Sequence, residues 1–230
     1  MTEHVHSKPI AMIFNGVWSQ YAVATAPKYR DFFDLLYVHD LDDAQLARYP
    51  ALLIPFQNDH LAIAEHREAV YAFLAAGKKI AVFGDSAHWI DAQWADRPVN
   101  NYWWAENPDR PPVAHTDFSH PLFAGLTPRQ ACWHHHGVYT RTPDGARVLQ
   151  HTDDGEVICW STTAYGGELL AATQDPIVEH GVQQIRHLDH FVDQLVYWLC
   201  GRRPPSVRMT VNAAAYGQPW PETIDRRAAA

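Results

Sequence analysis

Short, largely apolar segments separated by amphipathic or polar stretches dominate the first third of the chain. They are IAMIF (10–14), LLYVHDL (35–41), ALLIPF (51–56) and KKIAVFG (78–84). Strands that are apolar on both faces suit a parallel sheet that is covered on both sides. Between the last two segments, residues 64–76 repeat apolar side chains at helical spacing, and Gly77 can end that helix. The pattern predicts a β-α-β crossover and an α/β fold.

The second half of the chain changes to strands joined by tight turns. Its candidate strands lie in CWHHHGVYT (132–140), ARVLQHT (146–152), EVICWSTTAY (156–165) and GELLAATQDP (167–176). Turns such as PDG (143–145) and DDG (153–155) are typical of antiparallel pairs. A last helix is expected within 185–201, where apolar residues again recur at helical spacing. We expect a mainly parallel sheet with additional antiparallel strands in the second half.

Two stretches lie outside these elements. Residues 96–112 are rich in Pro and Asn and predict a long loop that carries Trp103 and Trp104. The tail 204–230 has weak periodicity, so we expect an extended or partly disordered extension, which could pack on a neighbouring subunit of a homo-oligomer. Residues 1–203 are expected to form a single domain.

Charge and cysteine content exclude several classes of function. The net charge is -8 and the 18 Lys and Arg are scattered, which argues against nucleic-acid binding. The 3 cysteines are far apart and predict neither a disulfide framework nor a thiolate zinc site. MTEHVHSKP has no apolar leader segment, and no apolar stretch is long enough to cross a bilayer. We expect a cytoplasmic protein without membrane contact.

Two longer motifs carry a resemblance to a known family. They are HPLFAGLTP (120–128) and GGELLAATQDP (166–176). Together with the strand-helix-strand order before them, they make residues 8–201 resemble the class I glutamine amidotransferase-like superfamily. The nearest branch is the trehalose-utilisation (ThuA-like) proteins or a related family. The resemblance implies a flavodoxin-like, doubly wound α/β domain with its site at the carboxyl ends of the parallel strands, where open α/β sheets bind ligands.

The resemblance also bears on GDSAH (84–88), which follows the fourth strand. In the family's amidotransferases this turn carries a cysteine nucleophile between glycines, and Ser86 stands at the matching position. His88 stands where a small residue is expected on a strained nucleophile elbow. Asp175 stands about where the family has its catalytic histidine. A serine hydroxyl without an imidazole to take its proton is a poor nucleophile, so we do not expect glutamine hydrolysis.

Two other interpretations of GDS stay open. The first is a Ser86-dependent hydrolase of the GDS esterase type. That motif follows the first strand of its own fold, however, and the late histidines in DPIVEH and HLDH lack the spacing it needs. The second is a turn in which Gly84 permits the bend and Asp85 or Ser86 caps a following helix.

Histidine is frequent, with 15 residues, and three stand in a row in CWHHHGVY. If this segment is a strand, His134 and His136 share one face and could bind one divalent metal. Candidates for a third ligand are His88, Asp175, Glu179 and His180. The same histidines could instead serve acid/base catalysis, or form a polar wall bonded to Asp85 or Asp175. The metal is left open, and no nucleotide cofactor is predicted.

Polar residues follow the first and third strands as well as the fourth. They are Asn15, Gln57, Asn58, Asp59 and His60. Parallel strands end at one edge of a sheet, so we expect these side chains to line one pocket with GDSAHW. Candidate aromatic walls are Trp18, Trp89, Trp103, Trp104 and Trp133. Aromatic faces beside amides and carboxylates suit a polyhydroxylated ligand, which agrees with the carbohydrate association of the ThuA-like branch, although each tryptophan could also pack in the core.

Three functions from different classes follow. The first is an enzyme that acts on a small polar, possibly sugar-like, metabolite by hydrolysis, elimination or isomerisation, with acid/base or metal-assisted chemistry. Its candidate catalytic residues are Asp85, Ser86, His88, His134, His136 and Asp175. The second is a catalytically silent domain that binds a small molecule or carbohydrate. The third is an assembly role for the tail. We favour the first.

Overall fold

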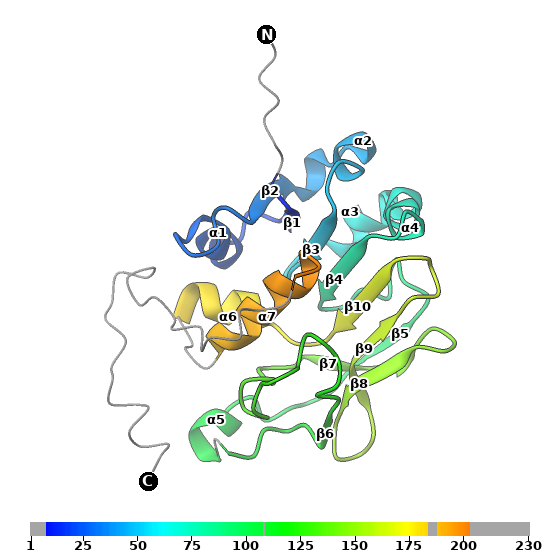
Figure 1. Cartoon of the computed structure of the whole chain (residues 1–230). Helices are drawn as coiled ribbons and strands as arrows, with labels where there is room; N and C mark the ends of the chain where they lie inside the picture. Colours follow the sequence, from blue (N-terminus) through cyan, green and yellow to red (C-terminus); the bar gives the residue numbers. More distant parts are fainter. Residues whose placement is uncertain (1–7, 108, 184–187, 203–230) are drawn as a thin grey trace.

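One sheet of ten strands runs through the described part of the chain, residues 8–107, 109–183 and 188–202 of this computed structural model (Figure 1). The main path is β2-β1-β3-β4-β10-β9-β7-β5, and β8 pairs with both β9 and β6. The strands are β1 (Ile10–Phe14), β2 (Phe33–Tyr37), β3 (Ala51–Ile54), β4 (Lys79–Phe83), β5 (Gln93–Asp96), β6 (His115–Thr116), β7 (Gly137–Arg141), β8 (Arg147–His151), β9 (Val157–Thr162) and β10 (Glu168–Ala172).

Strands β2, β1, β3, β4 and β10 pair in parallel, in that order. The apolar segments of the first third therefore form the strands that the sequence predicts. The second of them is shorter than expected, because the chain leaves the sheet after Tyr37 and forms a 3₁₀ turn, η1 (Val38–Asp40). All of β3 is buried, and so are four of the five residues of β4, as expected for parallel strands covered on both faces.

Strand β10 joins two differently built halves of the sheet. It pairs parallel to β4 on one side and antiparallel to β9 on the other. The strands beyond it pair antiparallel, as the tight turns predict. The strand expected within CWHHHGVYT begins only at Gly137, and before it His135 forms an isolated bridge to Gln174. The three histidines therefore lie beside the end of β10, outside the regular ladder.

Helices cover both faces of the sheet (Figure 1). They are α1 (Trp18–Thr25), α2 (Asp43–Leu46), α3 (His60–Glu65), α4 (Arg67–Ala75), α5 (Trp103–Glu106), α6 (Pro176–Gln183) and α7 (Asp189–Leu199). The helix expected over 64–76 is two helices, α3 and α4, which meet at His66. Helix α7 confirms the last predicted helix, and α5 lies within the expected long loop. The sequence reasoning did not predict α1 or α6.

Most of the core lies in two apolar clusters, one on each face of the sheet, and a small third cluster contains Trp103 and Trp133. Alternate residues of a strand point to opposite faces, so Ile10 and Met12 pack with α1, α6 and α7. Ala11 and Ile13 pack with α2, α3 and α4 on the other face. Burying a side chain of this kind contributes about 1.5 to 3 kcal/mol. The fold is thus mixed α/β, with a parallel set of strands extended by antiparallel ones.

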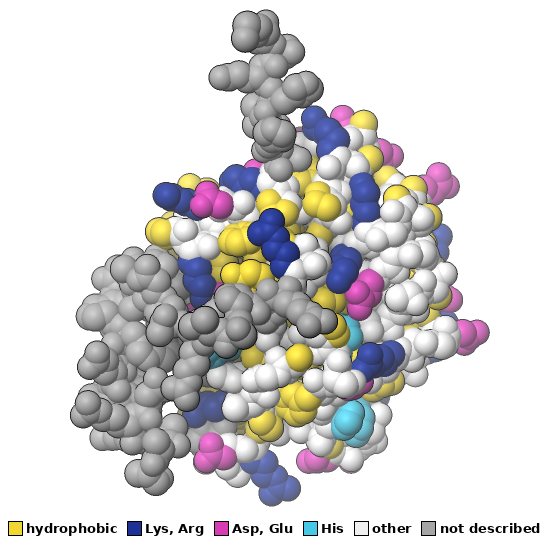
Figure 2. Space-filling view, in the orientation of Figure 1, with side chains coloured by type: hydrophobic (Ala, Val, Ile, Leu, Met, Phe, Trp, Pro, Cys, Tyr) yellow, Lys and Arg dark blue, Asp and Glu magenta, His cyan; other side chains and the backbone are white. Residues whose placement is uncertain are grey.

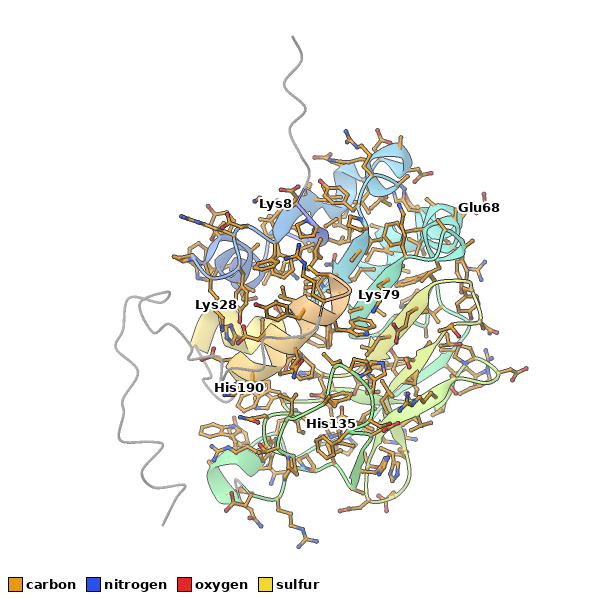
Figure 3. The ribbon with its side chains drawn as sticks, in the orientation of Figure 1. Lys8, Lys28, Glu68, Lys79, His135 and His190 are labelled. Atoms are coloured by element: carbon orange, nitrogen blue, oxygen red, sulfur yellow. The ribbon has the colours of Figure 1, made fainter. Side chains whose placement is uncertain are left out.

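The two motifs that carry the family resemblance meet at the amino edge of the parallel strands. His120 Nε2 of HPLFAGLTP lies 3.2 Å from Glu168 Oε1 of GGELLAATQDP. Lys79, labelled in Figure 3 near β4, places its Nζ 3.3 Å from the other oxygen of Glu168. The carboxyl ends of the same strands lie at the opposite edge, where the polar clusters are expected.

The surface shows no single basic stripe on the face drawn in Figure 2, where Lys and Arg side chains are spread among other residues. Within the described residues, no helix combines the length and apolar character needed to cross a membrane. The predicted extension 204–230 lies outside the described residues.

Candidate functional site

The polar residues that follow β1, β3 and β4 surround one cavity at the carboxyl edge of the sheet. Its volume is about 360 Å³. The lining residues are Asn15, Asn58, Asp59, His60, Leu61, Asp85 and His88. Cavities that hold small molecules measure roughly 300 to 1,000 Å³. The structure therefore brings these clusters together as the shared strand edge predicts, and their role in binding stays a prediction.

Two asparagine side chains tie the strand ends that form the cavity floor. Asn58 Nδ2 donates to the Ile13 carbonyl at 2.7 Å, which joins the end of β3 to β1. Asn15 Nδ2 donates to the Gln57 carbonyl at 3.2 Å, which forms a second link between the end of β1 and the residues after β3. These amides hold the floor in place, and part of their hydrogen-bonding capacity is already used.

Gln57 stands out among the non-glycine residues described because its φ of 63° is left-handed. A non-glycine residue pays roughly 1 to 2 kcal/mol for this conformation. Such strain is typical of functional sites whose surroundings enforce it. The exposed Gln57 side chain is not among the cavity-lining residues, so this predicted binding residue contributes its carbonyl, which receives the bond from Asn15.

Asp59 has a structural task at the cavity wall. Its Oδ1 accepts the backbone N–H groups of Leu61 and Ala62, each at 3.0 Å, and so caps α3. The bond from Ala62, ahead of that from Leu61, lowers the pKa of the carboxyl group. Its Oδ2 lies 3.8 Å from His39 Nε2. A second cavity of about 250 Å³ adjoins here, lined by Val38, His39, Asp59, Leu61, Ala62, Glu65 and His66.

The turn after β4 depends on Gly84. Its φ is 100°, and a Cβ there would lie 3.0 Å from Phe56 Cδ2, so no side chain fits without a shift. Beyond it, Asp85 Oδ1 accepts the N–H of Ala87 at 3.2 Å, and Oδ2 lies 3.7 Å from His88 Nε2. The chain then makes a short turn, so the helix expected after Ser86 is absent from this part of the described chain.

Ser86 is fully buried, and its hydroxyl is engaged. Ser86 Oγ lies 2.8 Å from the hydroxyl of Tyr139, which in turn donates to the Gly84 carbonyl at 3.3 Å. Burial raises the pKa of Tyr139, so its hydroxyl stays protonated and does not act as a base. The geometry favours the interpretation of GDS as a turn over that of Ser86 as a nucleophile. Sequence reasoning missed Tyr139, because nothing near it in the chain points to Ser86.

His60 begins α3 and forms part of the cavity wall. Its Nδ1 accepts the indole N–H of Trp89 at 3.1 Å. An indole nitrogen can only donate, so Nδ1 must be unprotonated and Nε2 carries the hydrogen. Burial lowers the pKa of this imidazole to about 4, against a smaller opposing effect of Asp85. Trp89 itself is 1% exposed, so this predicted binding residue is a core side chain that orients His60.

One histidine and one aspartate from different strand ends form a close pair. His136 Nε2 lies 2.8 Å from Asp175 Oδ2, and the Asp175 side chain is almost completely buried. His136 also stacks on Phe56, with ring centroids 4.4 Å apart and planes at 20°. The Phe56 carbonyl accepts a 3.0 Å bond from the buried Gln20. Sequence reasoning missed Phe56 and Gln20, whose roles depend on contacts between distant segments.

The other histidine of the pair predicted to bind a metal has a different environment. His134 stacks on Trp133 at 4.3 Å, and Trp104 stacks on the same indole at 6.3 Å. Burial lowers the pKa of His134. Trp133 is 1% exposed and Trp104 38%, so Trp104 is the more accessible of the two. The His134 carbonyl accepts the N–H of Asp175 at 3.2 Å, which places the stack beside the His136–Asp175 pair.

The candidate metal ligands do not gather into one set. Among the residues that the structure describes, no group of three or more His, Cys, Asp or Glu is placed to hold a metal ion. His136 is paired with Asp175, and the buried His180 lies 2.5 Å from Asp189 of α7. The side chain of Glu179 lies outside the described residues. Trp18 is 66% exposed at the start of α1, its ring is tilted against that of Tyr21 at 5.5 Å, and it is not among the residues that line the cavity.

Comparisons with known proteins find a shared fold. No family model and no curated protein matches the chain. A cytoplasmic protein of Salmonella typhimurium aligns with 83% of this chain and 98% of its own, at a TM-score of 0.54 and 10% identity. A second, from strain LT2, aligns with 84% and 99%, at 0.55 and 13%.

A Thermoplasma acidophilum protein, described as one of the subunits of a GMP synthase, aligns with 86% of this chain and 96% of its own, at a TM-score of 0.55 and 13% identity. A protein of Bacteroides uniformis described as ThuA-like aligns at a TM-score of 0.44, which is too low to support an argument. At such identities the likeness concerns the fold alone. The aligned structures share the α/β fold that the sequence predicts.

Proposed function

We propose that this chain is a non-glutaminase member of the amidotransferase-like fold. In this proposal it binds a small polar, sugar-like metabolite at the carboxyl edge of its parallel strands and acts on it by acid/base chemistry. The observation that carries the proposal is the His136–Asp175 pair, with Nε2 and Oδ2 2.8 Å apart. The pair does not line the polar cavity itself but connects to its wall through Phe56, which stacks on His136 and lies against Gly84, the residue before Asp85. Assignment to the ThuA-like branch, and a cytoplasmic, homo-oligomeric protein, remain part of the proposal.

The strand order supports a flavodoxin-like domain. The parallel set runs β2-β1-β3-β4-β10, which matches the 2-1-3-4-5 order of that fold. Ligands of doubly wound sheets bind where the strand order reverses, and here the reversal lies between β1 and β3. Asn15 and Asn58 stand at these two strand ends, and both line the cavity.

The His136–Asp175 pair has the arrangement of a general base. A carboxylate accepts hydrogen bonds, so Oδ2 of Asp175 fixes the hydrogen on Nε2 and leaves the lone pair of Nδ1 for a substrate proton. The buried carboxylate would stabilise the imidazolium that forms. Phe56 stacks on the imidazole and so restricts its plane.

A second group is needed to return the proton, and the neighbouring strand end supplies one. Strands β4 and β10 are parallel neighbours, joined beyond their ends by a 2.8 Å bond from Gly84 N to the Ala172 carbonyl. Asp85 and His88 follow β4 and line the cavity, while Asp175 follows β10. Two acid/base groups on adjacent strand ends suit hydrolysis, elimination or isomerisation, and all three remain within the proposal.

The same geometry argues against the chemistry of the amidotransferases. The residue at the position of their nucleophile, Ser86, is buried and bonded to Tyr139. The residue at the position of their histidine is Asp175. The absence of this nucleophile and histidine at the two positions favours a second candidate function, a domain that binds its ligand without turnover.

Turnover of a panel of sugars, sugar derivatives and related polar metabolites tests the proposal. His136→Gln and Asp175→Asn should each lower kcat about 10² to 10⁴-fold, the usual contribution of a positioned acid or base. Asp43→Asn is the matched control, because Asp43 forms another 2.8 Å pair with a histidine, His66, at an exposed position. It should keep the wild-type kcat.

Three outcomes would contradict the proposal. Glutamate release from glutamine that is lost in Ser86→Ala would restore the amidotransferase mechanism. Unchanged kcat in Asp175→Asn would remove the His136–Asp175 pair from the reaction. Saturable binding of a panel member, seen as a shift in melting temperature but never accompanied by turnover, would establish the binding domain.

A further inference from the structure

Four backbone N–H groups near the cavity, those of Asn15, Leu61, Ala62 and Ala87, are already occupied by side-chain oxygen atoms of the chain itself. In doubly wound folds, N–H groups after the strands commonly receive phosphates or carboxylates. Here Gln20 Oε1 accepts the N–H of Asn15 after β1, at 3.0 Å. After β3, Oδ1 of Asp59 accepts two N–H groups at the start of α3. After β4, Oδ1 of Asp85 accepts the N–H of Ala87.

Two of these internal acceptors are carboxylates, so they also make the cavity electronegative. The hydrogen bonds from the α3 backbone lower the pKa of Asp59 and keep it ionised. His60 supplies no compensating charge, because burial lowers its pKa to about 4. Neither Lys nor Arg is found among the described residues that line this cavity or the one adjoining it.

The remaining oxygen of each carboxylate is available for a ligand. Oδ2 of Asp85 and Oδ2 of Asp59 each have a histidine nitrogen no closer than 3.7 Å, beyond hydrogen-bonding distance. Each Oδ2 can accept a hydrogen bond, while the Oδ1 of the same carboxylate is held in place by backbone N–H groups. The cavity is therefore prepared for ligand groups that donate, such as hydroxyl or ammonium groups.

We infer that this cavity takes a polar molecule that is uncharged or positively charged, and rejects molecules that depend on a phosphate or carboxylate group for binding. The inference rests on the proposed function, in that it takes the cavity as the ligand site. It narrows the proposed sugar-like class to hydroxyl-rich or amine-bearing compounds and excludes phosphorylated ones.

Three probes that share one ring and differ in charge test this inference. They are D-glucosamine, D-glucose and D-glucose 6-phosphate, titrated into the full chain at pH 7, where the amine of glucosamine is mainly protonated and an ordinary imidazole is mainly uncharged. The backbone amide signals of Asn15, Leu61, Ala62 and Ala87 report binding by NMR. Glucosamine and glucose should shift these signals with dissociation constants at least about tenfold below that of glucose 6-phosphate, which corresponds to a difference in binding free energy of about 1.4 kcal/mol.

Asp85→Asn separates charge from shape, because the amide oxygen can still accept the N–H of Ala87. It should weaken glucosamine about threefold relative to glucose, in the range of an exposed ion pair. Asp144→Asn, on the exposed turn after β7, is the control and should change neither affinity. Equal or tighter binding of the phosphate, or no amide shift with any probe, would overturn the inference.

This test measures binding and needs no turnover. If the selectivity is found and His136→Gln leaves every reaction unchanged, the proposed catalysis fails and the inferred ligand class stands. If turnover depends on His136 and the phosphorylated probe binds best, the ligand class fails and the proposed catalysis stands.

Discussion

Replacing His60 with glutamine should reduce the loss of folding stability that the protein undergoes between pH 8 and pH 5. The folded imidazole has a pKa of about 4, because burial disfavours its charged form. The unfolded chain has an ordinary histidine pKa near 6.5. As the pH falls below 6.5, the unfolded state therefore binds a proton that the folded state does not bind.

The size of this effect follows from the two pKa values. At pH 5 the proton stabilises the unfolded state by about 2 kcal/mol, rising to roughly 3 kcal/mol at pH 4. Glutamine does not titrate, and its amide oxygen can still accept the indole N–H. Urea unfolding of wild type and His60→Gln at pH 8 and pH 5 measures the difference, and the pH 8 values show the cost of the substitution itself.

A second variant guards against a packing artefact. Trp89→Phe keeps the His60 imidazole but removes the indole N–H. Only the neutral imidazole can accept that N–H, so the loss of stability between pH 8 and pH 5 should also become smaller. Burial lowers the pKa of His134 and His135 as well, so some loss of stability at low pH should remain in every variant. The reasoning would be refuted if the unfolding free energies of wild type and His60→Gln fell by the same amount from pH 8 to pH 5.

Three further predictions concern stability, each measured by urea unfolding. Gln57→Gly should stabilise the fold by about 0.5 to 1 kcal/mol, because glycine avoids the cost of the left-handed φ at the expense of some chain entropy; a loss of stability would contradict this. Gly84→Ala should destabilise by about 2 kcal/mol, because its Cβ would crowd Phe56, and an unchanged midpoint would show that the turn relaxes freely. Asp193→Asn should lower the free energy of unfolding by about 3 kcal/mol, because it leaves the Lys28 ammonium without its buried counter-charge. Adding Lys28→Met to this variant should recover stability, and a double variant that stays as unstable as Asp193→Asn would contradict this account.

The sequence predicts the sheet better than the helices, for a physical reason. A buried parallel strand must be apolar on both faces, and IAMIF, ALLIPF and KKIAVF show this without any knowledge of their partners. Helix α1 lacks a side-chain N-cap and has no acidic residue in its first turn. It packs closely on α6, where Gly181 lies against the Ser19 backbone, and such tertiary contacts do not appear in local sequence.

The candidate site was predictable to the level of strand ends. Asn15, Asn58, Asp59, Asp85 and His88 line one cavity because residues after neighbouring parallel strands must lie together. The side-chain partners were not predictable, since they depend on rotamers and on packing between distant segments. His134 and His136 were expected to share one face of a strand, but the strand begins after them and each has its own aromatic partner.

The position of β10 between the two halves of the sheet has a consequence for biosynthesis. Its residues pair with residues of β4 that the ribosome adds 89 positions earlier, as the registers Glu168 with Lys79 and Ala172 with Phe83 show. Until β10 emerges, β4 is an apolar strand with one unpaired edge, the kind of edge that recruits other nascent chains. Asp175 arrives later still. A chain interrupted before residue 168 would therefore be prone to aggregation and would also lack Asp175, so the late strand makes solubility and the His136–Asp175 pair appear together.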